Sequence, residues 1–313
     1  MWSVVRVVLA LGIFSFVVTR ADPGAALAHL RAAPWWALVV PSVLLLANSC
    51  LHAVRLRLLL PAPRPSWWAV LRCVLLGNFI GLALPTGGGE AAKVVALSRH
   101  TGSMTSALGP LGASRVMELG PWGLLVWWGA VAVLPGHVPA FVPFAWLSGA
   151  AMLGVLLVAG AAMRWPGPAL AWLPAPISRR LFRLAEVHAN ARDIAACALL
   201  AVPFALVNCG VIYVILRAYG VPLTYLEVMG VIPTIDIIIS LPITVSGLGV
   251  REGMFVVALA GWGVDPAVAV AVSFTRWTAE LFRSGLGGLW WARSGFPQAR
   301  VADTSRDGAP TGD

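Results

Sequence analysis

The chain has 313 residues, of which 59% are hydrophobic and only 11% are charged. Soluble domains carry about 25% charged residues, so the composition excludes an ordinary soluble protein and indicates an all-α integral membrane protein with several spans. The net charge of +9 does not favour a nucleic-acid partner, because most basic residues lie in the connections between apolar segments, as on the cytoplasmic face of membrane proteins.

Six apolar segments are long enough for full crossings: residues 2–19, 35–53, 113–134, 141–163, 194–216 and 266–291. The first resembles a signal peptide in length, but no cleavage site of small residues follows it, and we expect it to be retained. The connections at 55–64 and 164–192 are rich in arginine, whereas 135–139 has neither Arg nor Lys. These charges predict a multi-pass protein of the cell membrane with both termini in the cytoplasm. Residues 1–292 are predicted to form one transmembrane domain, and 293–313 a disordered cytoplasmic tail.

Two further apolar regions, 67–112 and 226–263, are interrupted by proline and glycine. Leu84-Pro85 is followed by Gly-Gly-Gly-Glu ending at Glu90, and Leu241-Pro242 is followed by a glycine-rich stretch ending at Glu252. Irregular backbone at membrane depth is tolerated only where protein buries it or where it lines a wet cavity. We therefore predict a broken re-entrant hairpin in each region. Full crossings satisfy the loop charges equally well, and a tight bend for helix packing would leave a similar pattern.

The two broken regions share the spacing of rare residues. Four of the six glutamates form two pairs with the same separation of 28 residues: Glu90 with Glu118, and Glu252 with Glu280. A glycine precedes an arginine by 13 residues in both regions: Gly102 before Arg115, and Gly263 before Arg276. This pattern predicts two inverted repeats, at about 35–134 and 194–291, which is typical of secondary transporters.

In repeats of this kind the helix ends at each break present free amides and a positive dipole end to an anionic group. The pairs Arg115–Glu118 and Arg276–Glu280 each lie on one helix face, and each serves either such a site or the structure alone. Asn78 and Asp236, a few residues ahead of the Leu-Pro breaks, are expected to cap, hydrate or pack the breaks.

No metal, cofactor or catalytic site is predicted. The cysteines (Cys50, Cys73, Cys197 and Cys209) are scattered in apolar contexts without a C-x-x-C spacing, and we expect them to be small core residues. The histidines form no ligand-like pair, and the chain has no P-loop or hydrolase motif. We therefore expect neither a cofactor nor an enzymatic activity.

From about residue 53 to 291 the sequence resembles the flippase-like transmembrane domain of the lysylphosphatidylglycerol synthase family. The motifs that carry the resemblance are Asn78…Pro85…Gly88-Gly89-Glu90, Ser114-Arg115…Glu118 and, most specifically, Pro242…Gly247-Leu248-Gly249-Val250-Arg251-Glu252. The first motif departs from the family, which usually has a basic residue where Gly88 or Gly89 stands.

The resemblance implies a translocase for membrane lipids, such as an anionic phospholipid, an aminoacylated lipid or an isoprenoid-linked lipid. In this reading the two re-entrant hairpins form a headgroup pocket near the membrane midplane. The residues expected to attract phosphate are Arg115, Arg251 and Arg276. The residues expected to let the headgroup approach the backbone are Gly88, Gly89, Gly247 and Gly249. The residues expected to neutralise arginines or carry protons are Glu90, Glu118, Glu252 and Glu280.

The aminoacyl-transferase domain that gives the family its name has no counterpart in the chain, so we expect that the chain does not make the modified lipid. The alternative is a non-transporting scaffold for a lipid- or glycan-modifying enzyme, which would then be its partner. The sequence does not predict the oligomeric state.

Overall fold

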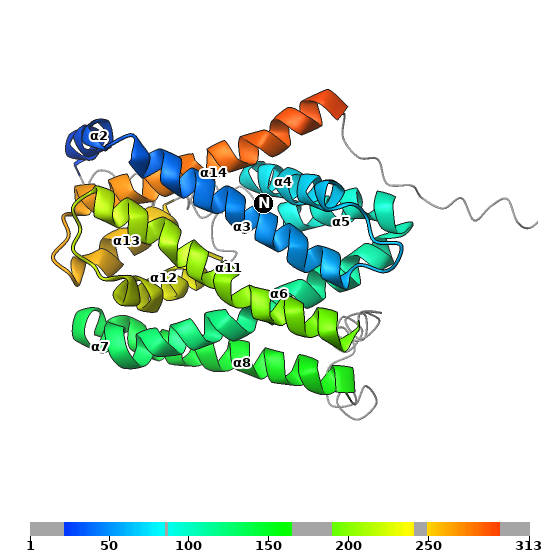
Figure 1. The fold of residues 1–313 in the computed structure, drawn as a ribbon. Coiled ribbons are helices and arrows are strands. Elements are labelled where there is room, and N and C mark those ends of the chain that lie inside the picture. Colours follow the sequence, from blue (N-terminus) through cyan, green and yellow to red (C-terminus); the bar gives the residue numbers. More distant parts are fainter. Residues whose placement is uncertain (1–21, 85–86, 165–189, 241–248, 295–313) are drawn as a thin grey trace, which may run out of the picture.

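The structure is a computed structural model, and it describes residues 22–84, 87–164, 190–240 and 249–294. The regular structure of these residues is entirely helical, which confirms the predicted all-α class. In chain order the elements are α2 (Pro23–Ala32), α3 (Trp36–Leu59), α4 (Trp67–Ala83), α5 (Gly88–Thr101), α6 (Met104–Trp128), the π-helix η1 (Gly129–Val133), α7 (Leu134–His137), the 3-10 helix η2 (Pro139–Phe141), α8 (Val142–Arg164), α11 (Ala191–Ala218), α12 (Tyr225–Ser240), α13 (Val250–Ala260) and α14 (Pro266–Ser294) (Figure 1).

Four helical stretches are long and apolar enough to cross a membrane: Trp36–Leu59, Met104–His137, Pro139–Ala161 and Ala191–Ala218. They confirm four of the six predicted crossings and identify a multi-pass membrane protein. The predicted crossing at 2–19 and most of the predicted tail lie outside the described residues. The remaining predicted crossing corresponds to α14, which has 29 residues but carries three charged side chains in its middle: Arg276, Glu280 and Arg283.

Two predicted boundaries in the first half of the chain are wrong. Helix α3 continues to Leu59, so Arg55 and Arg57 belong to this helix and not to a cytoplasmic loop. The predicted loop at 135–139 is helical except for Val138, which separates α7 from η2. Hydropathy marks where a segment leaves the membrane, but a helix is ended by its backbone and capping contacts, which hydropathy does not report.

The predicted apolar piece at 94–112 is also not a single segment. Helix α5 ends at Thr101, and the φ of its C-cap residue, Gly102, is 82°, in the left-handed region. The side chain of Ser103 then accepts a hydrogen bond from the Ser106 amide to start α6. The helix that carries Arg115 therefore begins at Met104, and Arg115 lies about three turns inside it. Arg276 lies about as far inside α14.

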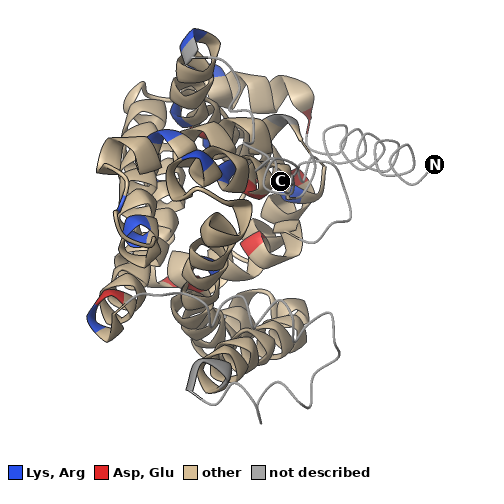
Figure 2. Ribbon diagram, turned by 90° about the vertical axis from the view of Figure 1, so that its right-hand side faces the viewer, with Lys and Arg blue, Asp and Glu red and all other residues tan. Residues whose placement is uncertain are grey.

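The chain contains two four-helix segments of the same order, α3–α6 and α11–α14. In each segment a long helix is followed by two short helices that pack against one another, and then by a second long helix. Helix α3 packs against α11, and the last helix of each segment packs on the first short helix of the other: α14 on α4, and α6 on α12. In Figure 1 the α4–α5 pair lies toward the right end of the bundle and the α12–α13 pair toward the left end. Figure 2, which views the right-hand end, shows Lys and Arg positions on several helices there.

Glycine allows the close approach of helices at both of these crossings. A Cβ atom on Gly287 of α14 would overlap the backbone oxygen of Leu75 in α4. A Cβ atom on Gly129, where the π-helix continues α6, would overlap the backbone oxygen of Gly230 in α12. The two segments are thus joined by backbone-to-backbone contacts that a larger residue would disrupt.

The turns around the second short helix are also equivalent in the two segments. Gly87 and Gly249, immediately before α5 and α13, have φ values of 99° and 81°. Gly102 and Gly263, which follow these helices, have φ values of 82° and 70°. Left-handed backbone strongly favours glycine, which explains why these glycines keep the same spacing from the charged residues.

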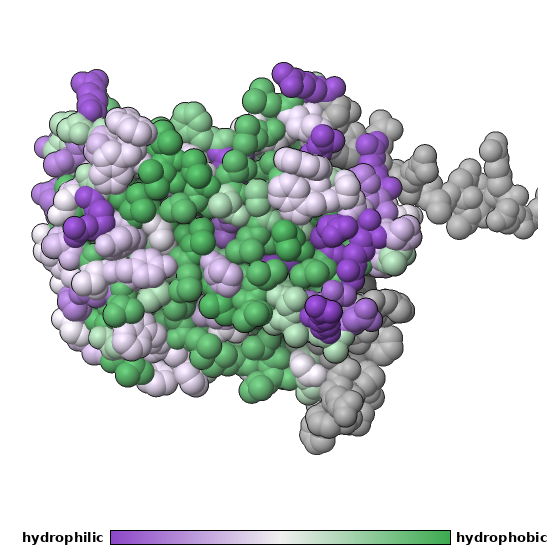
Figure 3. All heavy atoms as spheres, in the orientation of Figure 1, coloured by the Kyte–Doolittle hydropathy of each residue, from purple (hydrophilic) through white to green (hydrophobic). Residues whose placement is uncertain are grey.

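The outer surface is consistent with contact to lipid. Figure 3 shows hydrophobic residues across the middle of the visible face and more hydrophilic residues toward its ends. Leu147 and Leu157 of α8 and Leu199 of α11 are each more than 70% exposed. Among the cysteines, Cys73, Cys197 and Cys209 are buried and Cys50 is half-buried, all without disulfides, as predicted for small core residues.

Candidate functional site

Charged side chains in the bundle centre form two networks, each built from three helices. The first network comprises Arg55, Glu90, Lys93, Arg115 and Glu118, from α3, α5 and α6. The second network comprises Asp236, Arg251, Arg276 and Glu280, from α12, α13 and α14. The second network therefore combines both short helices of its segment with the long helix that follows them. The first takes its residues from the second short helix, from the long helix that follows it and from α3.

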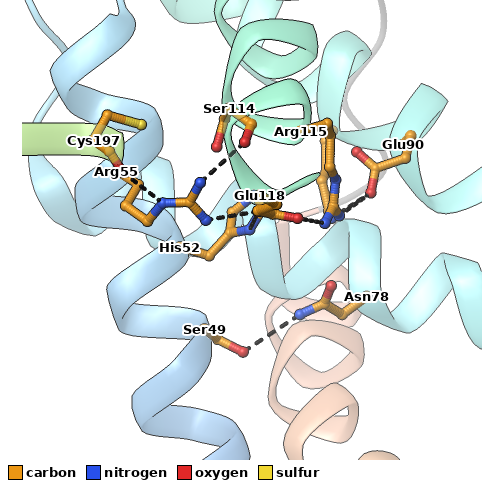
Figure 4. A network of polar contacts seen from close by, with 10 residues as sticks. Ser49, His52, Arg55, Asn78, Glu90, Ser114, Arg115, Glu118 and Cys197 are labelled. Atoms are coloured by element: carbon orange, nitrogen blue, oxygen red, sulfur yellow. Dashed lines mark hydrogen bonds and ion pairs between the residues drawn. The ribbon is translucent and has the colours of Figure 1, made fainter. Parts of the chain in front are cut away.

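Arg55 is the most deeply buried member of the first network. Its side chain has no exposed surface, and its Nη1 donates to Glu118 Oε1 at 2.7 Å (Figure 4). Its Nε and Nη2 donate to the backbone oxygens of Cys197 and Ser114 at 3.2 and 3.0 Å. A buried guanidinium needs a carboxylate and further hydrogen-bond acceptors to offset its desolvation, and Arg55 has both. It thereby fixes α3, α6 and α11 to one another.

Arg115 is the more accessible arginine of this network. It donates to Glu118 Oε2 at 2.7 Å and to the carboxylate of Glu90, which also binds Lys93 Nζ at 2.9 Å. The Arg115 and Glu90 side chains are 40% and 39% exposed, whereas that of Lys93 is 4% exposed. Figure 4 shows Arg115 lying between the two carboxylates. The outer part of the network is thus an ion pair that a solute can reach.

Arg276 is the centre of the second network. Its Nη1 and Nη2 donate to the two oxygens of Asp236 at 2.7 and 3.2 Å, and its Nε donates to Glu280 at 3.3 Å. Asn208 of α11 donates to Asp236 at 3.2 Å, and Arg251 lies 3.7 Å from Glu280. Every charged side chain of this network is at most 20% exposed, so it is more enclosed than the outer part of the first.

Glu252 occupies the position that corresponds to Glu90 but makes different contacts. Its carboxylate accepts hydrogen bonds from the Gly249 amide at 2.7 Å and from the Ser273 hydroxyl at 3.3 Å. Glu252 is therefore a cap for the N-terminus of α13, where the helix dipole favours a negative charge. Its predicted part in neutralising an arginine has no counterpart among these contacts.

A pocket of about 380 Å³ lies between the two networks. Its polar lining comes from Arg115 and Glu118 of the first network, from Asp236 of the second network, and from Asn208, which donates to Asp236. The remaining residues that line it are mostly apolar: Leu119, Trp122, Met152, Phe204, Ile237 and Ser240. The pocket lies among α6, α8, α11 and α12, and it combines a charged part with hydrophobic walls.

Only part of the predicted set lines this pocket. Arg115 and Glu118 do, whereas Arg251, Arg276, Glu252 and Glu280 are absent from its lining. Gly89 faces α4, where a Cβ atom would lie 2.5 Å from the Gly77 oxygen, and Gly88 faces Leu84, so in this structure both serve the packing of the short helices. Gly247 lies outside the described residues. The substrate-binding role of these residues stays a prediction.

Several residues of the site were not among the predicted ones. Lys93 and Asn208 make direct contacts within the networks, and Asp236, expected only to cap, hydrate or pack the break, is the main carboxylate of Arg276. Arg55 was assigned to a loop. Asn48, His52 and Arg55 recur at helical spacing and are all buried. A polar stripe at this spacing in an apolar segment is the signal that identifies such residues, because charges in membrane helices face the bundle interior.

Comparison with known families gives one match that covers most of the chain. The model of the family described as "Lysylphosphatidylglycerol synthase TM region" matches residues 3–282. In the same comparisons, no curated protein and no solved structure matches the chain.

Proposed function

The chain belongs to the family of the lysylphosphatidylglycerol synthase TM region, and from this premise we propose that it is a lipid translocase of the cell membrane. In this proposal an anionic phospholipid, or an aminoacylated or isoprenoid-linked lipid, passes its headgroup between leaflets through the pocket between the two networks. The observation that carries the proposal is a pocket with charged residues from both segments and hydrophobic walls.

The composition of the pocket suits a lipid better than a soluble solute. A headgroup that crosses hydrocarbon must exchange its water for other polar partners, since the desolvation of an unpartnered ion is very costly. Arg115, Glu118, Asp236 and Asn208 offer such partners at one place, and Trp122 belongs to the apolar walls along which an acyl chain can lie. A cavity of about 380 Å³ is within the range of small-ligand sites.

Arg115 is the proposed contact for the headgroup phosphate. Its two carboxylate partners, Glu90 and Glu118, neutralise it when the pocket is empty. A phosphate can replace Glu90, the more exposed of the two carboxylates, because guanidinium binds phosphate and carboxylate in similar bidentate geometry. Glu90 released in this way still has Lys93 as a partner, so the exchange leaves no carboxylate without a counter-ion.

We further propose that the α3–α6 and α11–α14 segments are inverted repeats, with each short-helix pair re-entrant from its own side of the membrane. The matching order of helices, the reciprocal crossings of α14 with α4 and of α6 with α12, and the location of the short-helix pairs toward opposite ends support this arrangement. Arg64, Arg192 and Arg293 lie in the arginine-rich connections and at the end of α14, which supports a cytoplasmic location for the end that carries α4 and α5.

Accessibility of single cysteines tests this topology. Thr105 follows the α5–α6 turn and Ala260 ends α13, and both are exposed. In a background without the four native cysteines, Thr105→Cys should react with a membrane-impermeant maleimide from the cytoplasmic side only, and Ala260→Cys from the external side only. Reaction of both from one side would rule out the inverted arrangement.

A scaffold without transport activity remains the second candidate, and one observation favours it. Most charges in the two networks are already paired, as in a core whose polar groups serve folding alone. This candidate predicts a stable association with a lipid- or glycan-modifying enzyme and no lipid movement by the isolated chain.

Reconstitution in liposomes separates the two candidates. The purified chain is incorporated into vesicles that contain trace fluorescent analogues of the major lipid classes of the host membrane, with and without a pH gradient. A chemical quencher added outside then measures the fraction of label that reaches the outer leaflet. The proposal expects faster translocation of at least one anionic or lipid-linked class than in protein-free vesicles. Equal rates for every class under both conditions would contradict it and leave the scaffold.

A further inference from the structure

His52 is a buried histidine that lies directly behind the wall of the pocket between the two networks. It belongs to α3, and it is 3% exposed. Its Nδ1 lies 3.6 Å from Glu118 Oε1, and 5.9 Å separates the centroid of its ring from that of the Phe204 ring. Glu118 and Phe204 both line the pocket. A titratable group that the two networks do not use is therefore one side chain away from the proposed headgroup site.

The surroundings of His52 offer an acceptor to each N–H group of a protonated imidazole. On one side, Glu118 lies within ion-pair distance of Nδ1. On the other side, Asn48 lies one turn earlier on the same buried face of α3, and the side chains of a helix lean toward its N-terminus. Asn48 Oδ1 and His52 Nε2 each lack a hydrogen-bond partner among the described residues. A proton on Nε2 would let these two atoms pair, as buried polar atoms nearly always do.

The charged groups that act on His52 are mostly cationic. They are Glu118 and Arg115 of α6, Arg55 of α3 itself, Lys93 of α5 and Arg283 of α14. The other two helices packed on α3 contribute no described charge here, since α4 presents Asn78 and α11 presents Phe204 and Cys197.

The charge balance of the first network connects His52 to an anion in the pocket. The network has three cations for two carboxylates, so it carries one net positive charge. A proton on His52 would add a second positive charge at a buried place, which is costly without compensation. An anion bound to Arg115 supplies that compensation, because Arg115 and His52 both lie beside Glu118.

We infer that His52 takes up a proton when an anionic headgroup binds to Arg115 in the pocket. The neutral ring keeps its hydrogen on Nδ1, toward Glu118, and the lone pair of Nε2 accepts a proton from bulk water. This proton returns to water when the anion leaves, so each anion travels with one proton and a pH gradient can drive its movement. That the anion is a lipid headgroup rests on the proposed function, whereas the linkage between proton and anion does not.

Linkage determines the direction and the upper limit of the effect. If one proton binds with each anion, the affinity for the anion rises as the pH falls. The increase is at most about tenfold per pH unit, because a single proton takes part.

Isothermal titration calorimetry of the purified chain in a neutral detergent counts the protons. Dioctanoyl phosphatidylglycerol is titrated in buffers with different enthalpies of ionisation, at several pH values between about 5 and 8, where histidine titrates. The dependence of the measured enthalpy on that of the buffer gives the protons taken up per ligand. The wild type should take up as much as one proton with the phospholipid and none with uncharged dioctanoylglycerol. Sulfate serves as the free anion.

Variants assign the proton to His52. His52→Gln keeps a polar side chain that does not titrate, and His52→Leu removes the polar group, so both should lose the uptake and the pH dependence of affinity. Thermal unfolding identifies the variant that is folded, and a purely structural role of His52 would alter this temperature without altering the proton count. The matched control is His100→Gln, at an exposed position of α5, which should take up protons like the wild type.

Each outcome bears on a different part of the inference. Equal proton uptake by the wild type and by a folded His52 variant would overturn it, as would a lack of binding by both anions. Uptake with sulfate that depends on His52 would support the linkage and show that a free anion is sufficient. Lipid translocation driven by a pH gradient that His52→Gln leaves unchanged would contradict the inference but not the proposed function. Uptake that depends on His52 in a chain that moves no lipid would contradict the proposed function but not the linkage.

Discussion

The two charged networks occupy equivalent places in the two helical segments, yet they differ in exposure and in balance. The first has three cations for two carboxylates, and its Arg115–Glu90 pair is about 40% exposed. The second has two cations for two carboxylates, all at most 20% exposed. The first network is therefore accessible and positively charged, whereas the second is enclosed and neutral.

The neighbours of the equivalent glutamates explain this difference. Glu90 has Lys93 one turn later on α5, and this ammonium draws the carboxylate into ion pairs. Glu252 has Phe255 at the corresponding position of α13 and instead turns back to the Gly249 amide and to Ser273. Its place as a charge partner is taken by Asp236, whose counterpart ahead of the first break is the neutral Asn78. Under the proposed function, the comparison predicts that ligand exchange occurs in the first network and that the second network holds its helices together.

The largest loss of stability is expected from substitution of Glu118, whose carboxylate pairs with both Arg55 and Arg115. Glu118→Gln would leave the guanidinium of Arg55 buried without a counter-ion, and the free energy of unfolding should fall by about 3–5 kcal/mol. Thermal unfolding in detergent and the amount of protein in the membrane measure this loss. The double variant Arg55→Met/Glu118→Leu, which removes both charges, should recover most of it. A Glu118→Gln variant as stable as the wild type would show that Arg55 does not depend on this pair.

A smaller effect is expected for Glu90, which belongs to the accessible part of the first network. Glu90→Gln leaves the buried Lys93 ammonium without its carboxylate, and a loss of about 2 kcal/mol lies between the values for exposed and buried pairs. Translocation should decrease as well, because the proposed exchange needs the Glu90 carboxylate to return to Arg115 and release the phosphate. Chemical unfolding and the liposome assay report the two effects separately. Normal translocation by a folded Glu90→Gln protein would refute the exchange at Arg115.

The smallest effect is expected at Glu252, because it caps a helix. Glu252→Gln retains an oxygen that can accept from the Gly249 amide, so the loss of stability should be about 1 kcal/mol or less. The same measurements on Glu90→Gln and Glu252→Gln test the comparison directly. Equal losses of stability and of translocation in both variants would mean that the two glutamates have the same role, as the sequence repeat alone suggests.

Much of this arrangement was predictable from the sequence because it depends on spacing. The 28-residue separation of the Glu pairs predicted matching positions for them in two segments, and the structure has Glu90 and Glu252 on α5 and α13 and has Glu118 and Glu280 on α6 and α14. The glycines Gly102 and Gly263 have positive φ, a backbone requirement that a sequence records reliably. Four membrane crossings followed from length and hydropathy alone.

The roles of individual charged residues could not be predicted, because they depend on tertiary contacts that sequence spacing does not specify. Arg55 follows an apolar run and has the appearance of a loop arginine, but α3 extends by one more turn and buries it against α6 and α11. Glu252 has the same sequence position as Glu90, and only the neighbouring Ser273 and the free Gly249 amide decide that it caps a helix.

The most direct test of the account is a reversible block of the pocket between the networks. Ser240 lines the pocket and is exposed, whereas Ala260 is exposed and is not among the lining residues. In a background without native cysteines, Ser240→Cys and Ala260→Cys proteins are reconstituted and treated with a bulky methanethiosulfonate reagent. The account expects translocation to stop in the Ser240→Cys protein, to return on addition of reducing agent, and to continue throughout in the Ala260→Cys protein. Undiminished translocation by fully modified Ser240→Cys protein would show that the lipid headgroup does not pass through this pocket.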